Sequence, residues 1–325
     1  CGNAVAREAA MNKWTSMQER VTSYLRARRS VGYSLKVEGA QLQRFACFAD
    51  QRRHQGHITL NLAVAWANSS QKSHQIGRAR RLEVVRSLAR YCAIFEPETE
   101  IPPSHLLGPA HRRLTPHIYN DREIAQLLDM ANGLRPKQGL RPATMQCLLG
   151  LLASTGLRIS EALRLSRNDV DLHQGILLVR KTKFRKSRYV PMHPMVCDAI
   201  LNYADFRDQR LPVVQNSSFF LLDDGSALRY RQALYAFQQI RAQLGWDACS
   251  TGRKPRLYDL RHTFACRRLL AWYKEGADID RMIPLLSTYL GHAKVSDTYW
   301  YLTGIPALMA IVVARFEHQS QLNLM

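Results

Sequence analysis

The sequence lacks the features that mark membrane, secreted, metal-binding and nucleotide-binding proteins. No apolar run approaches the ~18 residues of a membrane span, and no secretory signal is visible at the start. The 7 cysteines include no Cys-x-x-Cys pair, which argues against a disulfide framework or a zinc site and favours a reducing compartment. No phosphate-cradling glycine motif occurs. We therefore expect a cytoplasmic protein that needs no metal, no nucleotide and no membrane.

Acidic residues are scarce relative to basic ones. The chain has 26 Asp and Glu against 46 Lys and Arg, a formal net charge of +20. Residues 1–116 hold 18 basic and 8 acidic side chains, and residues 117–325 hold 28 and 18, so each part carries +10. Two basic globular parts indicate that the protein binds a long polyanion with both of them. We interpret this partner as nucleic acid. The alternative is a basic solvated surface, but the excess consists mainly of arginine, which suits bidentate phosphate contacts.

The first part of the chain has helical periodicity and no strand pattern. Apolar residues recur at helical intervals in 14–29, 38–52 and 76–95, with a short apolar stretch at 58–67. We predict an all-helical domain over residues 14–96.

The last of these helices has a strongly basic outer side. Its arginines are Arg78, Arg80, Arg81, Arg86 and Arg90. Such a run is most often a solvated face, but in a chain this basic we predict that it lies against DNA phosphates.

Residues 97–116 are predicted to link two domains. The stretch contains Pro97, Pro102, Pro103, Pro109 and Pro116, so it should run extended rather than continue a helix. Arg112 and Arg113 near its end are further predicted DNA contacts. A linker of this length lets two modules wrap a duplex, although it could equally be a passive tether.

The second part, residues 117–317, is predicted to be mainly helical with a small antiparallel sheet. Residues 176–179 and 187–190 read as strands, and between them 181–186 form a basic hairpin tip. Residues 219–222 are a further candidate strand. The helices expected here span 120–130, 145–154, 195–207, 230–244, 256–273 and 278–290.

Five short motifs follow one another in this part. Thr155-Gly156-Leu157-Arg158 places Arg158 at the opening of a helix, with Glu161 one turn on and able to hold the guanidinium. A hairpin lysine precedes Val190-Pro191. Further on come Leu260-Arg261-His262, Leu290-Gly291-His292 and, nine residues after that histidine, Tyr301. Each piece alone has an ordinary structural explanation. In this order and spacing they resemble the tyrosine recombinase (phage integrase) family over about 116–317, and residues 14–95 resemble its core-binding domain by helical and basic character only.

The resemblance implies the role of each motif. Arg158 and Arg261 would clamp the scissile phosphate, and His292 would hydrogen-bond to it. Tyr301 would be the nucleophile that forms a 3′-phosphotyrosyl link, with Tyr299 as a rival whose spacing from the histidine is two residues short.

The hairpin residues have implied roles as well. Lys183 would protonate the leaving 5′ oxygen, and Lys181 and Lys186 are the alternatives if the register differs. Arg185 and Lys186 are also predicted DNA contacts.

One position departs from the family pattern. The residue three before Arg261 is usually histidine, and here it is Tyr258. A phenol with a reference pKa of about 10 is a poor general base near neutral pH, although it can still form a hydrogen bond. His262 lies one turn further along the same helix. We interpret it as support for the site or as partial compensation for the histidine that is missing at position 258.

The end of the chain is too apolar for an exposed helix. Residues 307–316 are therefore predicted either to fold back on their own domain or to dock on a neighbour. The family resemblance favours docking, because it implies a terminal helix that packs on an adjacent protomer of a DNA-bound homotetramer. Residues 318–325 form a tail. We therefore predict a site-specific DNA recombinase that exchanges strands through a Holliday junction, bacterial and nucleoid-associated when bound, with accessory DNA-bending proteins as possible partners. The alternatives are a type IB topoisomerase-like enzyme and a DNA-binding relative that has lost catalysis.

Overall fold

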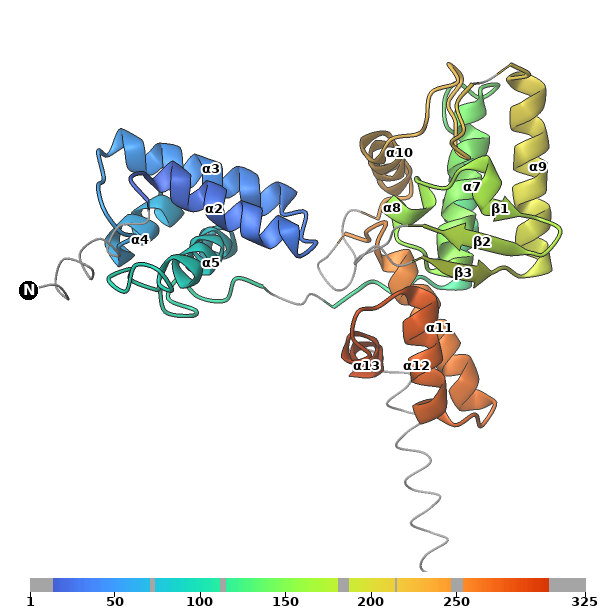
Figure 1. Cartoon of the computed structure of the whole chain (residues 1–325). Helices are drawn as coiled ribbons and strands as arrows, with labels where there is room; N and C mark the ends of the chain where they lie inside the picture. The colour runs from blue at the N-terminus through green and yellow to red at the C-terminus, as the bar shows by residue number, and fades with distance from the viewer. Residues whose placement is uncertain are drawn as a thin grey trace, which may run out of the picture. The chain divides into compact units, whose positions relative to one another are not determined.

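The chain forms two compact units that divide between Leu114 and Thr115 (Figure 1). The computed structural model describes residues 14–70, 74–111, 115–180, 187–213, 215–246 and 254–303. No helix in these ranges is both long and apolar enough to cross a membrane.

The first unit is a bundle of helices. They are α2 (Met17–Ser30), α3 (Lys36–Gln51), α4 (Leu60–Asn68) and α5 (Gln75–Cys92). Ser16 begins α2 by accepting a hydrogen bond from the Glu19 backbone N–H, and Thr59 does the same for α4 at Leu62. The apolar stripe of each helix points inward to one core that includes the fully buried Phe45 and Leu88.

Part of the predicted linker packs on this first unit. Arg20 makes a two-pronged contact with Glu96, with Nε 2.8 Å from Oε2, and both side chains are buried. The backbone N–H of Glu100 donates to Ile58 O at 2.9 Å, and Arg80 Nε donates to Ala110 O at the same distance. Residues 97–111 are therefore held by hydrogen bonds to α5 and to the segment before α4. The domain boundaries themselves stay predictions.

The second unit contains a small antiparallel sheet among helices. Strands β1 (Val170–Asp171), β2 (Ile176–Val179) and β3 (Arg188–Pro191) lie in the order β1-β2-β3, with Leu177 opposite Val190. The helices are α6 (Asp121–Asn132), α7 (Leu140–Thr155), α8 (Ile159–Ala162), α9 (Pro194–Arg210), α10 (Tyr230–Gln243), α11 (Asp259–Lys274), α12 (Ile279–Leu290) and α13 (Ser296–Thr303). The predicted fold class, mainly helical with a small antiparallel sheet, is confirmed.

Helix α7 is the centre of the second unit. It packs against α6, α9 and α11, and its buried residues lie on several sides, which agrees with its apolar sequence. The candidate strand at 219–222 is wrong as a regular strand: Leu221 makes only an isolated bridge with Ala227.

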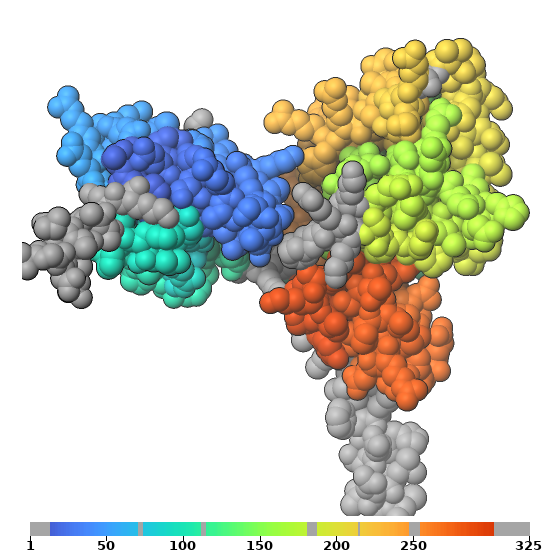
Figure 2. All heavy atoms as spheres, in the orientation of Figure 1, coloured from blue at the N-terminus to red at the C-terminus, as the bar shows by residue number. Residues whose placement is uncertain are grey.

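Helices α11, α12 and α13 have a core of their own. Ala265, Leu269, Ile283 and Leu290 form it together with Tyr301. Figures 1 and 2 show these helices, in orange and red, as one lobe beside the sheet-bearing lobe of the second unit.

Gly156 packs closely against Phe264 of α11 and Leu290 of α12, and its replacement by alanine is expected to destabilise the second unit by about 2–5 kcal/mol. The residue ends α7 with a φ of 62°, and a Cβ there would lie 2.5 Å from Phe264 Cδ1. The left-handed conformation costs an L-residue about 1–2 kcal/mol, and overpacking adds about 1–3. Urea unfolding measures the change. Gly245→Ala is the matched control, because its φ is 69° but nothing lies within 4 Å of the added Cβ. Equal losses in both variants would contradict the packing argument.

Candidate active site

The C-terminus of α12 is surrounded by three arginines. Gly291 ends this helix with a φ of 68°, so the last carbonyls are left without helical partners. Arg188 Nε donates to Tyr289 O at 2.7 Å, and Arg261 Nη2 donates to Leu290 O at 2.7 Å. Arg158 Nη2 donates to Gly291 O at 3.1 Å. The negative end of the helix dipole thus orients three guanidiniums from three separate elements. We call Arg158, Arg188 and Arg261 the arginine cluster.

Two members of the cluster share one acceptor. Arg158 Nη1 lies 3.5 Å from Leu290 O, the same oxygen that accepts from Arg261. Arg261 also donates to Gly156 O at 2.7 Å, and its side chain is 1% exposed. The turn at Gly156 therefore serves both arginines, because it supports Arg261 and opens α8 at Arg158. The two arginines that the motifs singled out are brought together.

Glu161 balances part of the charge of the cluster. Its Oε1 lies 2.8 Å from Arg158 Nη1, and its Oε2 lies 2.9 Å from Arg188 Nη2. Burial would raise the pKa of this carboxyl, but hydrogen bonds and charges from Arg188 and then Arg158 lower it to about 2. Glu161 is therefore ionised at neutral pH, as its expected role of holding Arg158 requires.

Arg188 was missed by the sequence analysis. It is on β3, where one basic residue in a strand looks like a solvated side chain, and nothing in the motif order points to it. Its side chain is only 11% exposed and reaches α12 and Glu161 at once.

The arginine cluster carries excess positive charge. It has three guanidiniums against the single carboxylate of Glu161. Burial, and then the neighbouring charge of Arg158, lower the pKa of Arg261, although a guanidinium stays protonated in proteins. Arg261 Nε is enclosed and has no hydrogen-bond partner among the described residues. Such a site favours an anion with several acceptor oxygens, which a phosphate provides.

Tyr301 lies beside this charge. Its side chain is 3% exposed, and its ring stacks on His292 with centroids 5.9 Å apart and planes 21° apart. Burial raises the pKa of the phenol, and the charge of Arg261 partly opposes that shift. The rival Tyr299 on the same helix is 43% exposed. Of the two tyrosines, Tyr301 is therefore the one that packs against the motif residues.

His292 directly follows the α12 turn. Its backbone N–H donates to Ser287 O at 2.9 Å, and its Nδ1 lies 2.7 Å from Thr298 Oγ1. Burial, and then the charges of Arg261 and Arg158, lower the pKa of the imidazole to about 4. The ring is therefore neutral at physiological pH, and it can donate from only one nitrogen.

Tyr258 and His262 form an aromatic wall next to Tyr301. The ring of His262 lies 5.0 Å from Tyr258, 5.1 Å from Trp300 and 5.4 Å from Tyr301. Tyr258 is 44% exposed, whereas His262 is buried and its Nδ1 has no partner in the described part of the chain. Burial lowers the pKa of His262 to about 4. Tyr258, which occupies the position where the family usually has histidine, is thus exposed to solvent, whereas His262 one turn further on is buried.

Six of the other predicted site residues cannot be placed. Lys181, Lys183, Arg185, Lys186, Arg112 and Arg113 lie outside the described residues. The strands that flank the lysines do pair as an antiparallel hairpin, since Val179 lies opposite Arg188.

The arginines of α5 do not form one free face. Arg81 donates to Trp66 O at 2.6 Å and to Ser69 Oγ at 2.9 Å, and its guanidinium lies 3.6 Å from the Trp66 ring centre. Arg86 pairs with Glu83 at 3.3 Å. Arg78, Arg80 and Arg90 are exposed. The guanidinium of Arg81 thus packs the first unit, and Arg80 also has an internal acceptor, because its Nε donates to Ala110 O.

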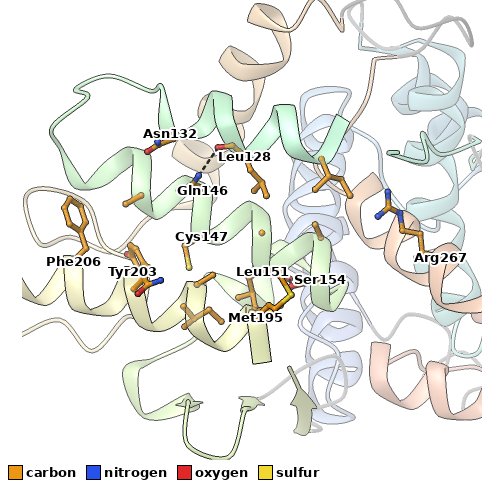
Figure 3. A pocket seen from close by; sticks show the side chains of 18 residues that line it. Leu128, Asn132, Gln146, Cys147, Leu151, Ser154, Met195, Tyr203, Phe206 and Arg267 are labelled. Atoms are coloured by element: carbon orange, nitrogen blue, oxygen red, sulfur yellow. Dashed lines mark hydrogen bonds between the residues drawn. The ribbon is translucent and has the colours of Figure 1, made fainter. Parts of the chain in front are cut away.

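An apolar groove of about 790 Å³ opens elsewhere in the second unit, between α6, α7 and α9 (Figure 3). Leu128, Cys147, Leu151 and Tyr203 line it, and Gln146 donates to Leu128 O at 3.3 Å. No member of the arginine cluster lines it, so it is separate from the site around Tyr301.

The buried His262 and the half-buried His292 predict how stability depends on pH. His262 and His292 have pKa values lowered from 6.5 to about 4, so between these values the unfolded chain binds more protons than the folded one. Stability should therefore fall as the pH falls through this window. We expect the free energy of unfolding of the second unit to be about 3–4 kcal/mol lower at pH 5 than at pH 7, measured by urea unfolding.

Gln substitution at both positions should flatten this dependence, because an amide does not titrate. Substitution of the exposed His173 is the control and should leave it unchanged. An unaltered slope in the double variant would show that other groups cause it.

Comparison with known proteins identifies the family of this chain. The sequence profile of the Phage integrase family matches residues 118–304. A Sinorhizobium fredii protein, y4rB, described as an integrase/recombinase, is 38% identical over 309 residues, which cover 94% of this chain and 98% of that protein. Tyrosine recombinase XerC of Chlamydia trachomatis is 30% identical over 227 residues, 68% of this chain and 65% of XerC.

Solved structures share the fold. The Tn1549 transposon integrase in complex with transposon right end DNA has a TM-score of 0.67 at 17% identity, over 94% of this chain and 99% of that one. The XerH site-specific recombinase bound to palindromic difH substrate has a TM-score of 0.57 at 19% identity, over 82% and 74%.

Fold, site and relatives together define the class of protein: it is a tyrosine-type site-specific recombinase. The profile covers more than half of the chain, and the Sinorhizobium relative covers nearly all of it. The chain belongs to the phage integrase family.

Proposed function

We propose that this recombinase cuts and rejoins double-stranded DNA with Tyr301 as the nucleophile. The observation that carries the proposal is that Arg158 and Arg261 meet at the Leu290 carbonyl, while Tyr301 stacks on the histidine two residues further on. A phosphate that binds the guanidiniums would thus lie close to the phenol. No metal or other cofactor is part of this proposal.

The chemistry assigns one step to each residue. The oxygen of Tyr301 loses its proton to solvent water and attacks the phosphorus, the bond from phosphorus to the 5′ oxygen breaks, and a 3′-phosphotyrosyl link forms. Arg158 and Arg261 neutralise the charge that builds on the non-bridging oxygens, and His292 adds a hydrogen bond. Lys183 gives a proton to the leaving 5′ oxygen. A 5′ hydroxyl from another strand then attacks the link, which restores the phosphodiester and frees Tyr301.

The assembly is part of the same proposal. Strand exchange between two duplexes through a Holliday junction requires several protomers, and we propose a homotetramer joined through residues 307–316, which lie outside the described residues. The exposed arginines of α5 and the basic residues 112, 113, 185 and 186 would contact phosphates, whose many charges make binding strongly salt-dependent. The Tn1549 and XerH structures hold DNA, which supports DNA as the partner. We also propose that the protein resides in the cytoplasm, on the nucleoid when bound.

Covalent capture tests this proposal without knowledge of the DNA site. The protein is incubated with a randomised duplex library that carries light, random nicks, so that a short cleaved end diffuses away and rejoining fails. Denaturing washes then keep only DNA that is bonded to protein, and sequencing of the retained DNA yields the site. We expect one enriched sequence and a DNA-linked peptide that contains Tyr301. Absence of any covalent DNA would refute the enzymatic proposal, and relaxation of plasmids without exchange between two plasmids would favour a topoisomerase-like activity.

A further inference from the structure

In the part of α13 whose side-chain burial the structure describes, residues 296–301, Thr298 is the one polar side chain that is fully enclosed. It is 0% exposed, and its Oγ1 lies 2.7 Å from Nδ1 of His292. Its backbone N–H donates to Val295 O at 2.8 Å, so the first turn of α13 holds it in place. No motif in the sequence pointed to this residue.

The hydrogen bond has a preferred direction. Nδ1 of His292 is the sole partner of the Thr298 hydroxyl within the described ranges. A buried hydroxyl proton without an acceptor costs the protein a hydrogen bond. If Nδ1 carried the imidazole proton, the hydroxyl would accept and its own proton would have no acceptor. The arrangement that satisfies both groups has Thr298 as the donor and Nδ1 as the acceptor.

The tautomer of His292 follows from that direction. Burial keeps the ring neutral, so the single proton must lie on Nε2 when Nδ1 accepts. The groups that face the ring are Arg158, Arg188 and Arg261 from three elements, and Asp297 and Tyr301 on α13. A neutral N–H donor is well suited here, because it can bind a phosphate oxygen without adding a fourth positive charge.

We propose that Thr298 is a positioning residue that holds His292 as the Nε2–H tautomer, so that Nε2 donates to a non-bridging oxygen of the scissile phosphate. The inference rests on the proposed function for the identity of the anion. The tautomer itself rests only on the hydrogen bond and the burial of Thr298.

Two substitutions separate the hydroxyl from the shape of the side chain. Thr298→Val keeps the volume and removes the hydroxyl, whereas Thr298→Ser keeps the hydroxyl. In protein labelled with ¹⁵N-histidine, His292→Gln identifies the resonances of His292. We expect wild type and Thr298→Ser to show an unprotonated Nδ1 and a protonated Nε2, and Thr298→Val to show a mixture of tautomers. A protonated Nδ1 in wild type, or an unchanged tautomer in Thr298→Val, would overturn the proposal.

Single-turnover cleavage of the captured site is the second readout. Partners that orient metal-binding histidines typically contribute about 10- to 100-fold to affinity or activity. By analogy we expect Thr298→Val to slow cleavage by about 10- to 100-fold, with little change in DNA affinity. The cleavage rate of Thr298→Ser should stay within about threefold of the wild-type rate, because serine keeps the hydroxyl that orients the histidine. Thr288→Val is the control, because that threonine is exposed on α12. In a His292→Ala background, Thr298→Val should have no further effect.

The outcomes distinguish the two proposals. If wild type forms no covalent DNA, the proposed function fails, yet the NMR measurement still decides the tautomer. If wild type cleaves and Thr298→Val cleaves equally fast, the inference about Thr298 fails alone.

Discussion

Tyr301→Phe is expected to abolish the covalent protein–DNA adduct completely. The substitution removes only the phenolic oxygen, which is the atom that would bond to phosphorus, and no other side-chain atom of the residue can replace it. The ring should keep its stacking on His292 and its edge contact with His262, so the lobe should fold as before. Gel analysis of the trapped reaction measures the adduct, and circular dichroism and DNA binding should be unchanged.

Tyr299→Phe is the matched control for that experiment. Tyr299 is on the same helix, two residues away, and its side chain is 43% exposed. Its phenylalanine variant should form the adduct at the wild-type rate. An adduct that survives Tyr301→Phe and disappears in Tyr299→Phe would transfer the nucleophile to Tyr299.

Arg261→Lys is expected to slow cleavage by about three orders of magnitude, which corresponds to about 4 kcal/mol of transition-state stabilisation. The guanidinium reaches Gly156 O with one nitrogen and Leu290 O with the other, at 2.7 Å each. A lysine ammonium is a single point donor and cannot form this fork while it also clamps two phosphate oxygens. The positive charge is kept, so the loss would report geometry rather than charge.

The same helix offers a control for Arg261→Lys. Arg268 is exposed on α11, and Arg268→Lys should leave the rate within about twofold, since surface changes of this kind have small effects. Rates are measured under single-turnover conditions on the captured site. If Arg261→Lys cleaves within tenfold of wild type, the phosphate clamp must lie elsewhere in the arginine cluster.

Tyr258 is where this chain departs from the family pattern, and the structure sharpens what the departure means. The phenol is 44% exposed, whereas the adjacent His262 is buried against Tyr301 with an unpartnered Nδ1. The sequence analysis interpreted His262 as support for the site or as partial compensation for the missing histidine. In the structure its ring contacts those of both Tyr258 and Tyr301, and its role stays a prediction.

Helical periodicity and motif order predicted most of the architecture. The stripes of apolar residues correspond to real helix faces because a helix in water must bury such a stripe. The sheet was predicted where two short strand-like stretches flank the basic tip, and β2 and β3 do pair there. By contrast, the basic run on α5 was read as one surface, and the structure shows that Arg81 lies on Trp66. Charge alone does not reveal which arginines have internal acceptors.

The sequence by itself determined the class of protein and the residues that it brings to the site: Arg158, Arg261, His292 and Tyr301 are separated along the chain but ordered in a way that chance does not explain. Only the tertiary structure decided how they are held. The two arginines are anchored by the backbone carbonyls of Gly156, Leu290 and Gly291. Every residue type has such a carbonyl, so no pattern of side chains in the sequence can reveal these anchors. Arg188 and Thr298 were invisible for the same reason, because a strand arginine and a helix threonine gain their roles only from the neighbours that folding places within 3 Å.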